Sequence, residues 1–210
     1  MNFKLNSLLR IYPHNIDILS VLFGSLLGDS YADKRLNKGT RFQFTQSSNN
    51  MEYLYWLHSF FALRGYCSSN KPTITYRIGN NGKKYYSLRF STYTYFSFDY
   101  IYDLFYKEGK KIIPMNLGDY LTPLALAIWI CDDGGVVSAG LKLCTNCFKK
   151  EEVLYLISIL KKVYNIDSNI QSAGSENQYI IYIPKSSMLK LSKIVKPYMI
   201  SSMHYKLNGF

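Results

Sequence analysis

Two strongly apolar runs mark the chain, and each ends abruptly at an acid. Residues 21–27 are followed by Gly28 and Asp29, and residues 124–131 are followed by Asp132 and Asp133. Each run is long enough for about two helical turns and is apolar on nearly every side, which predicts buried helices. The two acids lie about half the chain apart, so the pattern indicates an internal duplication.

The segments between these runs predict the same series of elements twice. In the first half we expect a strand at 41–46, a helix at 51–64, a hairpin of strands 73–78 and 85–91, and a helix at 95–106. Alternating polar and apolar residues indicate the strands, and the Asn80-Asn81-Gly82 turn joins the hairpin. A partner strand for 41–46 is expected within 31–39.

The second half repeats the order. Its predicted segments are a helix at 121–132, strands at 136–137 and 141–145 around Gly140, a helix at 150–164, hairpin strands at 169–171 and 179–183, and a helix at 186–194. This gives an α+β protein of two pseudo-symmetric αββαββα units, with halves at 1–116 and 117–210. Small residues such as Gly24, Gly28 and Ala125 would let the two apolar helices pack closely.

Acids at helix C-termini need an explanation, because the helix dipole is negative there and favours cations. Asp29 and Asp133 could simply mark helix exits into solvent. Two such acids at equivalent places favour another reading, in which the helices pack on each other and bring the carboxylates together. Carboxylates that approach closely repel unless a divalent cation lies between them.

These features resemble the two-motif, single-chain, I-SceI-like form of the LAGLIDADG homing endonuclease family. The resemblance includes Thr122-Pro123 before the second run, the Asp132-Asp133-Gly134-Gly135 end, and a lysine at comparable distance after each acid. Residues 110–114 and 203–207 add to it. The first run departs from the eponymous motif, since Gly28 and Ser30 flank Asp29.

The resemblance implies a site-specific double-strand DNA endonuclease that serves intron homing. Asp29 and Asp133 would be catalytic and would hold Mg²⁺ or Mn²⁺, with help from the backbone carbonyls of Gly28 and Asp132. Lys111 and Lys206 would flank the two sites. The fold would form a DNA-binding saddle, and one nicking site per half would let a monomer cut an asymmetric target.

Charge agrees with a nucleic-acid partner. Twenty-five Lys and Arg against 14 Asp and Glu give a net charge of +11, dispersed along the chain. Because no basic amphipathic helix stands out, we expect no membrane partner. Polar strand residues suited to base edges and phosphates are the predicted DNA contacts: Arg41, Gln43, Thr45, Thr75, Arg77, Ser87, Arg89, Lys142, Asn169 and Gln171.

Two alternatives remain open from the sequence. A protein of this fold could be an intron maturase that binds RNA and assists splicing, or an inactive DNA binder. The abundance of Tyr, Phe, Lys, Asn and Ile, whose codons are A/T-rich, indicates an organellar source, with the mitochondrion favoured over the chloroplast.

Overall fold

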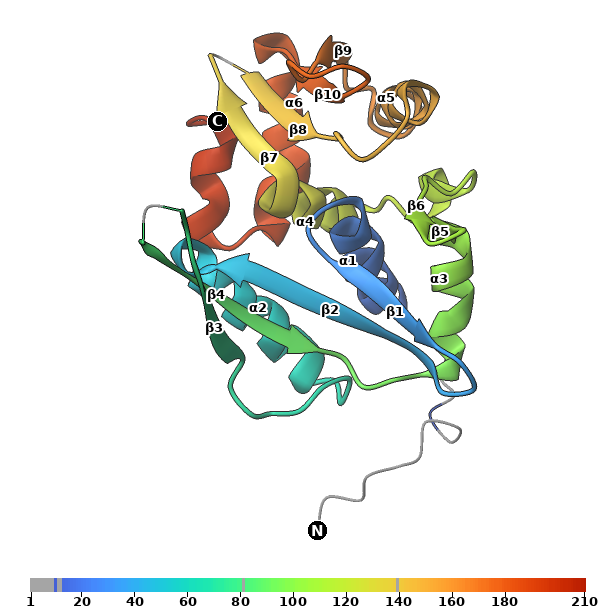
Figure 1. The fold of residues 1–210 in the computed structure, drawn as a ribbon. Coiled ribbons are helices and arrows are strands. Elements are labelled where there is room, and N and C mark those ends of the chain that lie inside the picture. Colours follow the sequence, from blue (N-terminus) through green and yellow to red (C-terminus); the bar gives the residue numbers. More distant parts are fainter. Residues whose placement is uncertain (1–9, 11–12, 81, 139) are drawn as a thin grey trace. The chain divides into compact units, whose positions relative to one another are not determined.

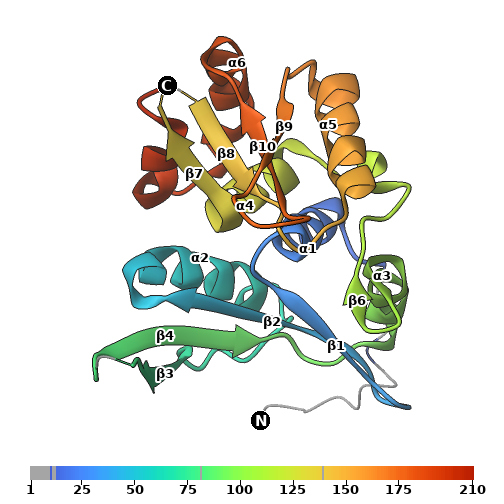
Figure 2. The same ribbon diagram turned by 45° about the horizontal axis from the view of Figure 1, so that its top comes forward.

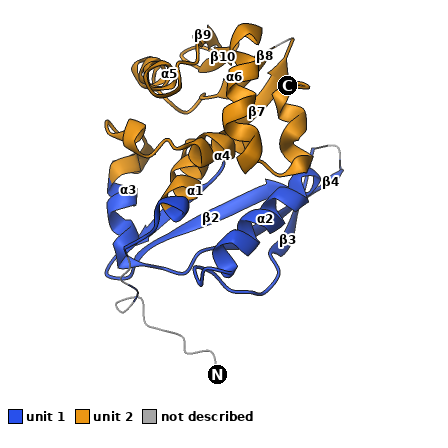
Figure 3. Cartoon of the chain, turned by 180° about the vertical axis from the view of Figure 1, so that it is seen from behind, with its two compact units in different colours: residues 1–18, 29–103 blue, residues 19–28, 104–210 orange. Residues whose placement is uncertain are grey.

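The computed structural model describes residues 10, 13–80, 82–138 and 140–210, and the chain divides into two compact units (Figure 3). Unit 1 comprises residues 1–18 and 29–103, and unit 2 comprises residues 19–28 and 104–210. Helix α1 (Ile16–Leu27) begins in unit 1 and continues into unit 2. The predicted halves 1–116 and 117–210 concern the sequence repeat and stay a prediction.

Unit 1 is built on an antiparallel sheet with the strand order β1-β2-β4-β3. The strands are β1 (Tyr31–Arg35), β2 (Gly39–Ser47), β3 (Thr73–Ile78) and β4 (Lys84–Ser91). Helix α2 (Met51–Ala62) lies over β2 and β4, and α3 (Asp99–Phe105) follows the sheet in the chain (Figures 1 and 2).

The alternation along β2 and β4 decides which face of this sheet α2 covers. Phe42, Phe44, Leu88 and Phe90 are buried on one face, where the stacked Phe44 and Phe90 rings have centroids 4.8 Å apart. The residues between them point to the other face. The half-buried strands expected from the sequence are therefore present.

Unit 2 contains a second antiparallel sheet with the order β7-β8-β10-β9. Its strands are β7 (Gly134–Val137), β8 (Gly140–Cys144), β9 (Asn169–Ser172) and β10 (Tyr179–Ile183). Its helices are α4 (Pro123–Asp133), α5 (Lys150–Tyr164) and α6 (Lys185–Val195). A small hairpin of β5 (Tyr106–Lys107) and β6 (Lys110–Lys111) precedes them.

The order of the second sheet is that of the first with every strand replaced by its counterpart, so the predicted duplication and the α+β class are confirmed. Within unit 2, the apolar run of α4 is fully enclosed, from Ala125 through Cys131. Burial on all sides agrees with the lack of a polar stripe in that segment.

Some boundaries differ from the expectation. The helix predicted at 95–106 starts at Asp99, because Phe96–Phe98 form a 3₁₀ turn. Gly140 does not lie in the turn between β7 and β8 but opens β8, paired with Val137. A Cβ at Gly140 would overlap the carbonyl oxygen of Ile183 on the neighbouring strand, so close strand approach accounts for this glycine. The predicted turn residue Asn81 lies outside the described residues.

None of the helices in the described part of the chain is both long and apolar enough to cross a membrane.

Candidate functional site

The site begins with the contact between the end of α1 and α4 inside unit 2. A Cβ added to Gly24 would overlap the carbonyl oxygen of Ala125, and one added to Gly28 would overlap the side chain of Asp132. The two helices thus approach to backbone contact, as the small residues predicted. The hydroxyl of Thr122, the N-cap of α4, donates to the Ser20 hydroxyl at 2.7 Å and ties the helix starts together.

The two predicted lysines occupy equivalent places. Lys111 Nζ donates to the carbonyl oxygen of Gly28 at 3.2 Å. Lys206 Nζ donates to the carbonyl oxygens of Cys131 at 2.5 Å and Asp132 at 3.2 Å. Each ammonium therefore lies at the carbonyl end of a motif helix, where the dipole favours a cation, and next to the residue that precedes a predicted catalytic acid.

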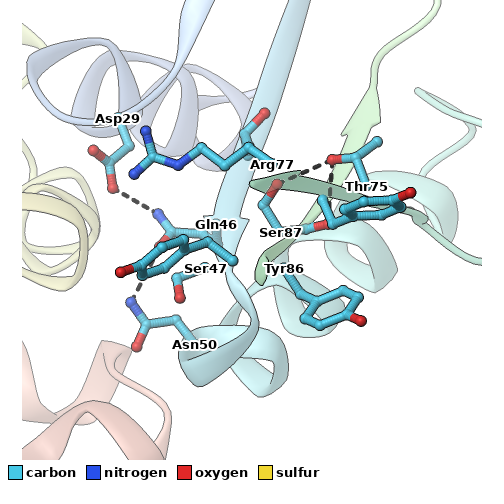
Figure 4. A pocket seen from close by; sticks show the side chains of 11 residues that line it. Asp29, Gln46, Ser47, Asn50, Thr75, Arg77, Tyr86 and Ser87 are labelled. Carbon is cyan, nitrogen blue, oxygen red and sulfur yellow. Dashed lines mark hydrogen bonds between the residues drawn. The ribbon is translucent and has the colours of Figure 1, made fainter. Parts of the chain in front are cut away.

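Asp29 is held by a chain of amide groups from unit 1. Gln46 Nε2 donates to Asp29 Oδ2 at 2.8 Å, and Asn50 Nδ2 donates to Gln46 Oε1 at 3.2 Å (Figure 4). These three residues line a hollow of about 550 Å³ together with Thr75, Arg77 and other residues of β2, β3 and β4. The carboxylate thus faces a polar space within reach of strand residues predicted to contact DNA.

Gln46 is not among the site residues predicted from the sequence, although the sequence carries a signal for it. It continues the inward-facing series after Phe42 and Phe44 and is only 6% exposed. A polar residue in a buried phase needs a hydrogen-bonding partner, and that partner is the predicted catalytic acid.

Asp133, the last residue of α4, has different surroundings. It lies near Cys147, whose thiol pKa is raised by burial and further by the Asp133 charge, while Lys111 lowers it. Thr145 is the positional counterpart of Gln46, because each residue lies the same distance before the following helix, α5 or α2. The Thr145 hydroxyl, however, donates to the Tyr179 carbonyl at 2.7 Å. Thr145 therefore uses its hydroxyl within the second sheet, whereas Gln46 uses its amide on Asp29.

Seven of the predicted DNA contacts share one face of the first sheet, opposite α2. The register pairs Thr45 with Arg89 and Thr75 with Ser87, and residues paired directly point to the same side. The set consists of Arg41, Gln43, Thr45, Thr75, Arg77, Ser87 and Arg89. Arg41 Nε also donates to Asp33 Oδ2 at 2.9 Å, so this arginine has a carboxylate partner in the structure.

The three predicted contacts of the second half also share a face. Lys142 pairs with Tyr182, which pairs with Asn169, and Gln171 pairs with Ile180 on the same side. Leu141, Leu143, Ile181 and Ile183 point the other way and are buried. The sheet register thus resolves the one-residue ambiguity that alternation alone leaves open.

The donors near the two acids fit a hard divalent cation. Each acid supplies a carboxylate and follows a residue with a backbone carbonyl oxygen, Gly28 before Asp29 and Asp132 before Asp133, and each carbonyl also accepts from a lysine. No cluster of three or more His, Cys, Asp or Glu side chains suited to a metal occurs among the described residues. This donor set suits Mg²⁺ or Mn²⁺, since Mg²⁺ commonly takes one or two carboxylates and completes its shell with water and substrate phosphates.

Known proteins place the chain in a family. The model of the LAGLIDADG DNA endonuclease family matches residues 19–191. The cytochrome b mRNA maturase bI2 of Saccharomyces cerevisiae is 50% identical over 209 residues, covering 96% of this chain and 49% of the relative, so the chain spans about half that protein's length.

Solved structures agree. The homing endonuclease I-WcaI, bound to its DNA recognition sequence, has a TM-score of 0.82 at 31% identity and covers 96% of both chains. I-DmoI in complex with DNA and Mn has a TM-score of 0.52 at 16% identity, covers 86% of this chain and 97% of its own, and shares the fold. The chain belongs to the LAGLIDADG DNA endonuclease family.

Proposed function

We propose that the chain is a site-specific double-strand DNA endonuclease that acts in intron homing as a monomer. The observation that carries this proposal is the repeated pairing of Lys111 with the Gly28 carbonyl and of Lys206 with the Asp132 carbonyl. Each lysine also caps a helix end, but its repetition beside an acid in both halves is what cleavage of two phosphodiester bonds would require. The halves 1–116 and 117–210 would each supply one nicking site.

In this proposal Asp29 and Asp133 would hold Mg²⁺ or Mn²⁺, with the carbonyls of Gly28 and Asp132 as further oxygen donors. A bound ion of this kind lowers the pKa of a water and stabilises the leaving 3′-oxygen during phosphodiester hydrolysis. The chain's own part is to orient the two carboxylates, through Gln46 in the case of Asp29. Lys111 and Lys206 offset phosphate charge or orient the attacking water.

Target binding is assigned to the polar sheet faces. Arg77 and Arg89 suit guanine edges or phosphates, Gln43 and Gln171 suit adenine, and Lys142 suits phosphate. The DNA-bound state of I-WcaI supports this assignment at the level of the fold. Release of counterions from phosphates predicts a steep salt dependence of DNA binding.

The test is cleavage of DNA by wild type and by Asp29→Asn and Asp133→Asn. A plasmid with uninterrupted cytochrome b coding DNA is the first substrate, chosen from the bI2 relative, and a randomised DNA library is the second. We expect cleavage that needs Mg²⁺ and stops with EDTA, and nicked circles in place of linear product from each single variant. Tight binding without metal-dependent cleavage of either substrate would reject the endonuclease.

A second function is proposed because of the maturase relative: binding of intron RNA to assist splicing. It predicts RNA binding and splicing activity that survive Asp29→Asn and Asp133→Asn, since no hydrolysis is involved. The same relative, together with the abundance of amino acids whose codons are A/T-rich, supports a mitochondrial location. Splicing of the host intron RNA by both variants measures this function separately from DNA cleavage.

A further inference from the structure

The β3–β4 hairpin carries a row of exposed apolar side chains on the side of the sheet that α2 covers elsewhere. Ile74, Tyr76 and Ile78 of β3 are 64%, 58% and 64% exposed, and Tyr86 of β4 is 47% exposed. Ile74 pairs with Leu88, which is buried on the α2 side, so all four residues lie on that side. We call Ile74, Tyr76, Ile78 and Tyr86 the tyrosine face.

Tyr76 and Tyr86 border the hollow that Asp29 lines, but the side chains of the tyrosine face point to the other side of the sheet from the predicted DNA-reading residues. Thr75 and Arg77 alternate with its β3 members and therefore point to the opposite side. Figure 4 shows Tyr86 directed away from Asp29, while the Thr75 hydroxyl bonds the Ser87 hydroxyl at 3.0 Å between the strands. Contacts to duplex DNA through Arg77, Arg89 and their neighbours would leave the tyrosine face open.

Charge around the hairpin selects the class of partner. Between Glu52 and Asp99 the sequence has no acid but six basic residues; Arg77 and Arg89 point to the opposite face, whereas Lys84 pairs with Ile78 and lies on the side of the tyrosine face. Lys84 Nζ lies 5.0 Å from the centroid of the Tyr76 ring, which is itself 5.9 Å from the Tyr86 ring. Flat aromatic rings beside ammonium groups suit a polyanion that also offers unstacked bases.

We propose that the tyrosine face binds single-stranded RNA, with bases stacked on Tyr76 and Tyr86 and phosphates near Lys84. Duplex DNA offers its bases only as edges in grooves, whereas unpaired RNA offers their flat faces. This inference rests on the second proposed function, RNA binding, and adds where the RNA lies. It would let one chain hold DNA and RNA on opposite sides of the same sheet.

The experiment measures binding of a fluorescein-labelled single-stranded RNA of about 16 nucleotides, a length that spans a typical single-strand site. Anisotropy titrations compare wild type, Tyr76→Ala/Tyr86→Ala, Tyr76→Phe/Tyr86→Phe and Tyr100→Ala, an exposed tyrosine of α3. We expect the double alanine variant to bind RNA roughly 10-fold or more weakly and the phenylalanine and Tyr100→Ala variants to bind like wild type, since stacking needs only the ring. Affinity for duplex DNA should not change in any of them.

Failure of the proposal is separable from failure of the RNA function. If wild type does not bind RNA, both fall; if it binds RNA and the double alanine variant binds equally well, only the tyrosine face is wrong. Equal loss of RNA binding in Arg89→Ala would place the RNA on the opposite face and overturn the proposal. Binding of single-stranded DNA with the same affinity and the same dependence on the tyrosines would also overturn it. So would light scattering that shows a dimer for wild type and a monomer for the double alanine variant.

Discussion

Lys206 Nζ lies 3.2 Å from the carbonyl oxygen of Asp132, and the side chain that makes this contact is only 5% exposed. A buried lysine is costly unless its ammonium is paired, and here two carbonyls at the end of α4 accept from it. Lys111 makes the corresponding bond to Gly28 but is half-buried. Lys206 should therefore contribute more than Lys111 to the free energy of unfolding, although the same role in cleavage is proposed for both.

We predict that Lys206→Met lowers the free energy of unfolding by about 1–3 kcal/mol, because it leaves two carbonyl acceptors without their donor. Lys111→Met should cost less. Each variant should cut one DNA strand roughly 100-fold more slowly, as expected when a charged group at the reacting phosphate is lost, so nicked plasmid should accumulate. Denaturant unfolding and plasmid nicking measure the two effects.

The matched control is Lys193→Met, an exposed lysine of α6 that removes the same charge. It should leave both unfolding and nicking near wild type. Linear product formed by Lys206→Met at the wild-type rate would show that this lysine is structural only.

Gln46→Glu should shift the pH dependence of cleavage upward. The change puts a second carboxyl group beside Asp29, where the Gln46 amide now lies 2.8 Å from Oδ2, and like charges at that distance raise the pKa of one of them. Because a metal ligand must be deprotonated, cleavage should require higher pH. The pH midpoint of single-turnover nicking is the measurement.

Gln43→Glu is the control for this change, since Gln43 lies on the same strand but points to the opposite face and accepts from the Tyr31 hydroxyl at 2.6 Å. It should weaken DNA binding without moving the pH midpoint. An unchanged midpoint in Gln46→Glu would separate Gln46 from the function of Asp29.

Much of this architecture follows from local pattern. The alternation of β2 and the apolar runs ending at Asp29 and Asp133 predict the strands, the buried helices and the duplicated order. The pairing of Thr45 with Arg89 could not be predicted, because register depends on which strands meet and on hairpin geometry. From the sequence alone, either of the two faces of the sheet could be the one that contacts DNA.

The support of the two acids was also beyond the sequence. No periodicity encodes the Gln46 bond to Asp29, and the place of Lys111 near Gly28 was expected only from the family resemblance. Gln46 stood out only as a polar residue in a buried phase. The sequence places Gly140 between two expected strands, yet in the structure it opens β8 and lets that strand approach the backbone of β10.

Gly24→Ala should destabilise the protein by about 1–3 kcal/mol through overpacking of α1 against α4. The added Cβ would overlap the Ala125 carbonyl and lie 2.9 Å from Ile128 Cβ, so the helices must separate. Gly118→Ala is the control, because a Cβ at Gly118 would lie 3.9 Å from Ile159 Cγ2, an ordinary contact. Thermal unfolding should show a lower Tm for Gly24→Ala alone, and equal values would refute close helix packing.

His14 predicts loss of stability on mild acidification. Its ring bonds the Tyr66 hydroxyl at 2.8 Å and the Ser97 hydroxyl at 2.9 Å and packs on Phe98 with centroids 4.4 Å apart. Burial lowers its pKa below the ordinary value of 6.5, with a smaller opposing effect from Ser97. The unfolded chain therefore takes up the proton first, and the stability present above pH 6.5 is lost as pH falls through the lower folded-state pKa.

His14→Gln keeps hydrogen-bonding capacity but cannot take up a proton in this range. It should flatten the fall in the free energy of unfolding below pH 6.5, measured by urea titrations at stepped pH. His204→Gln serves as the control, since His204 lies in unit 2 and bonds the Met199 carbonyl at 3.2 Å. If His14→Gln and wild type lose stability in parallel below pH 6.5, another group governs the acid response of unit 1.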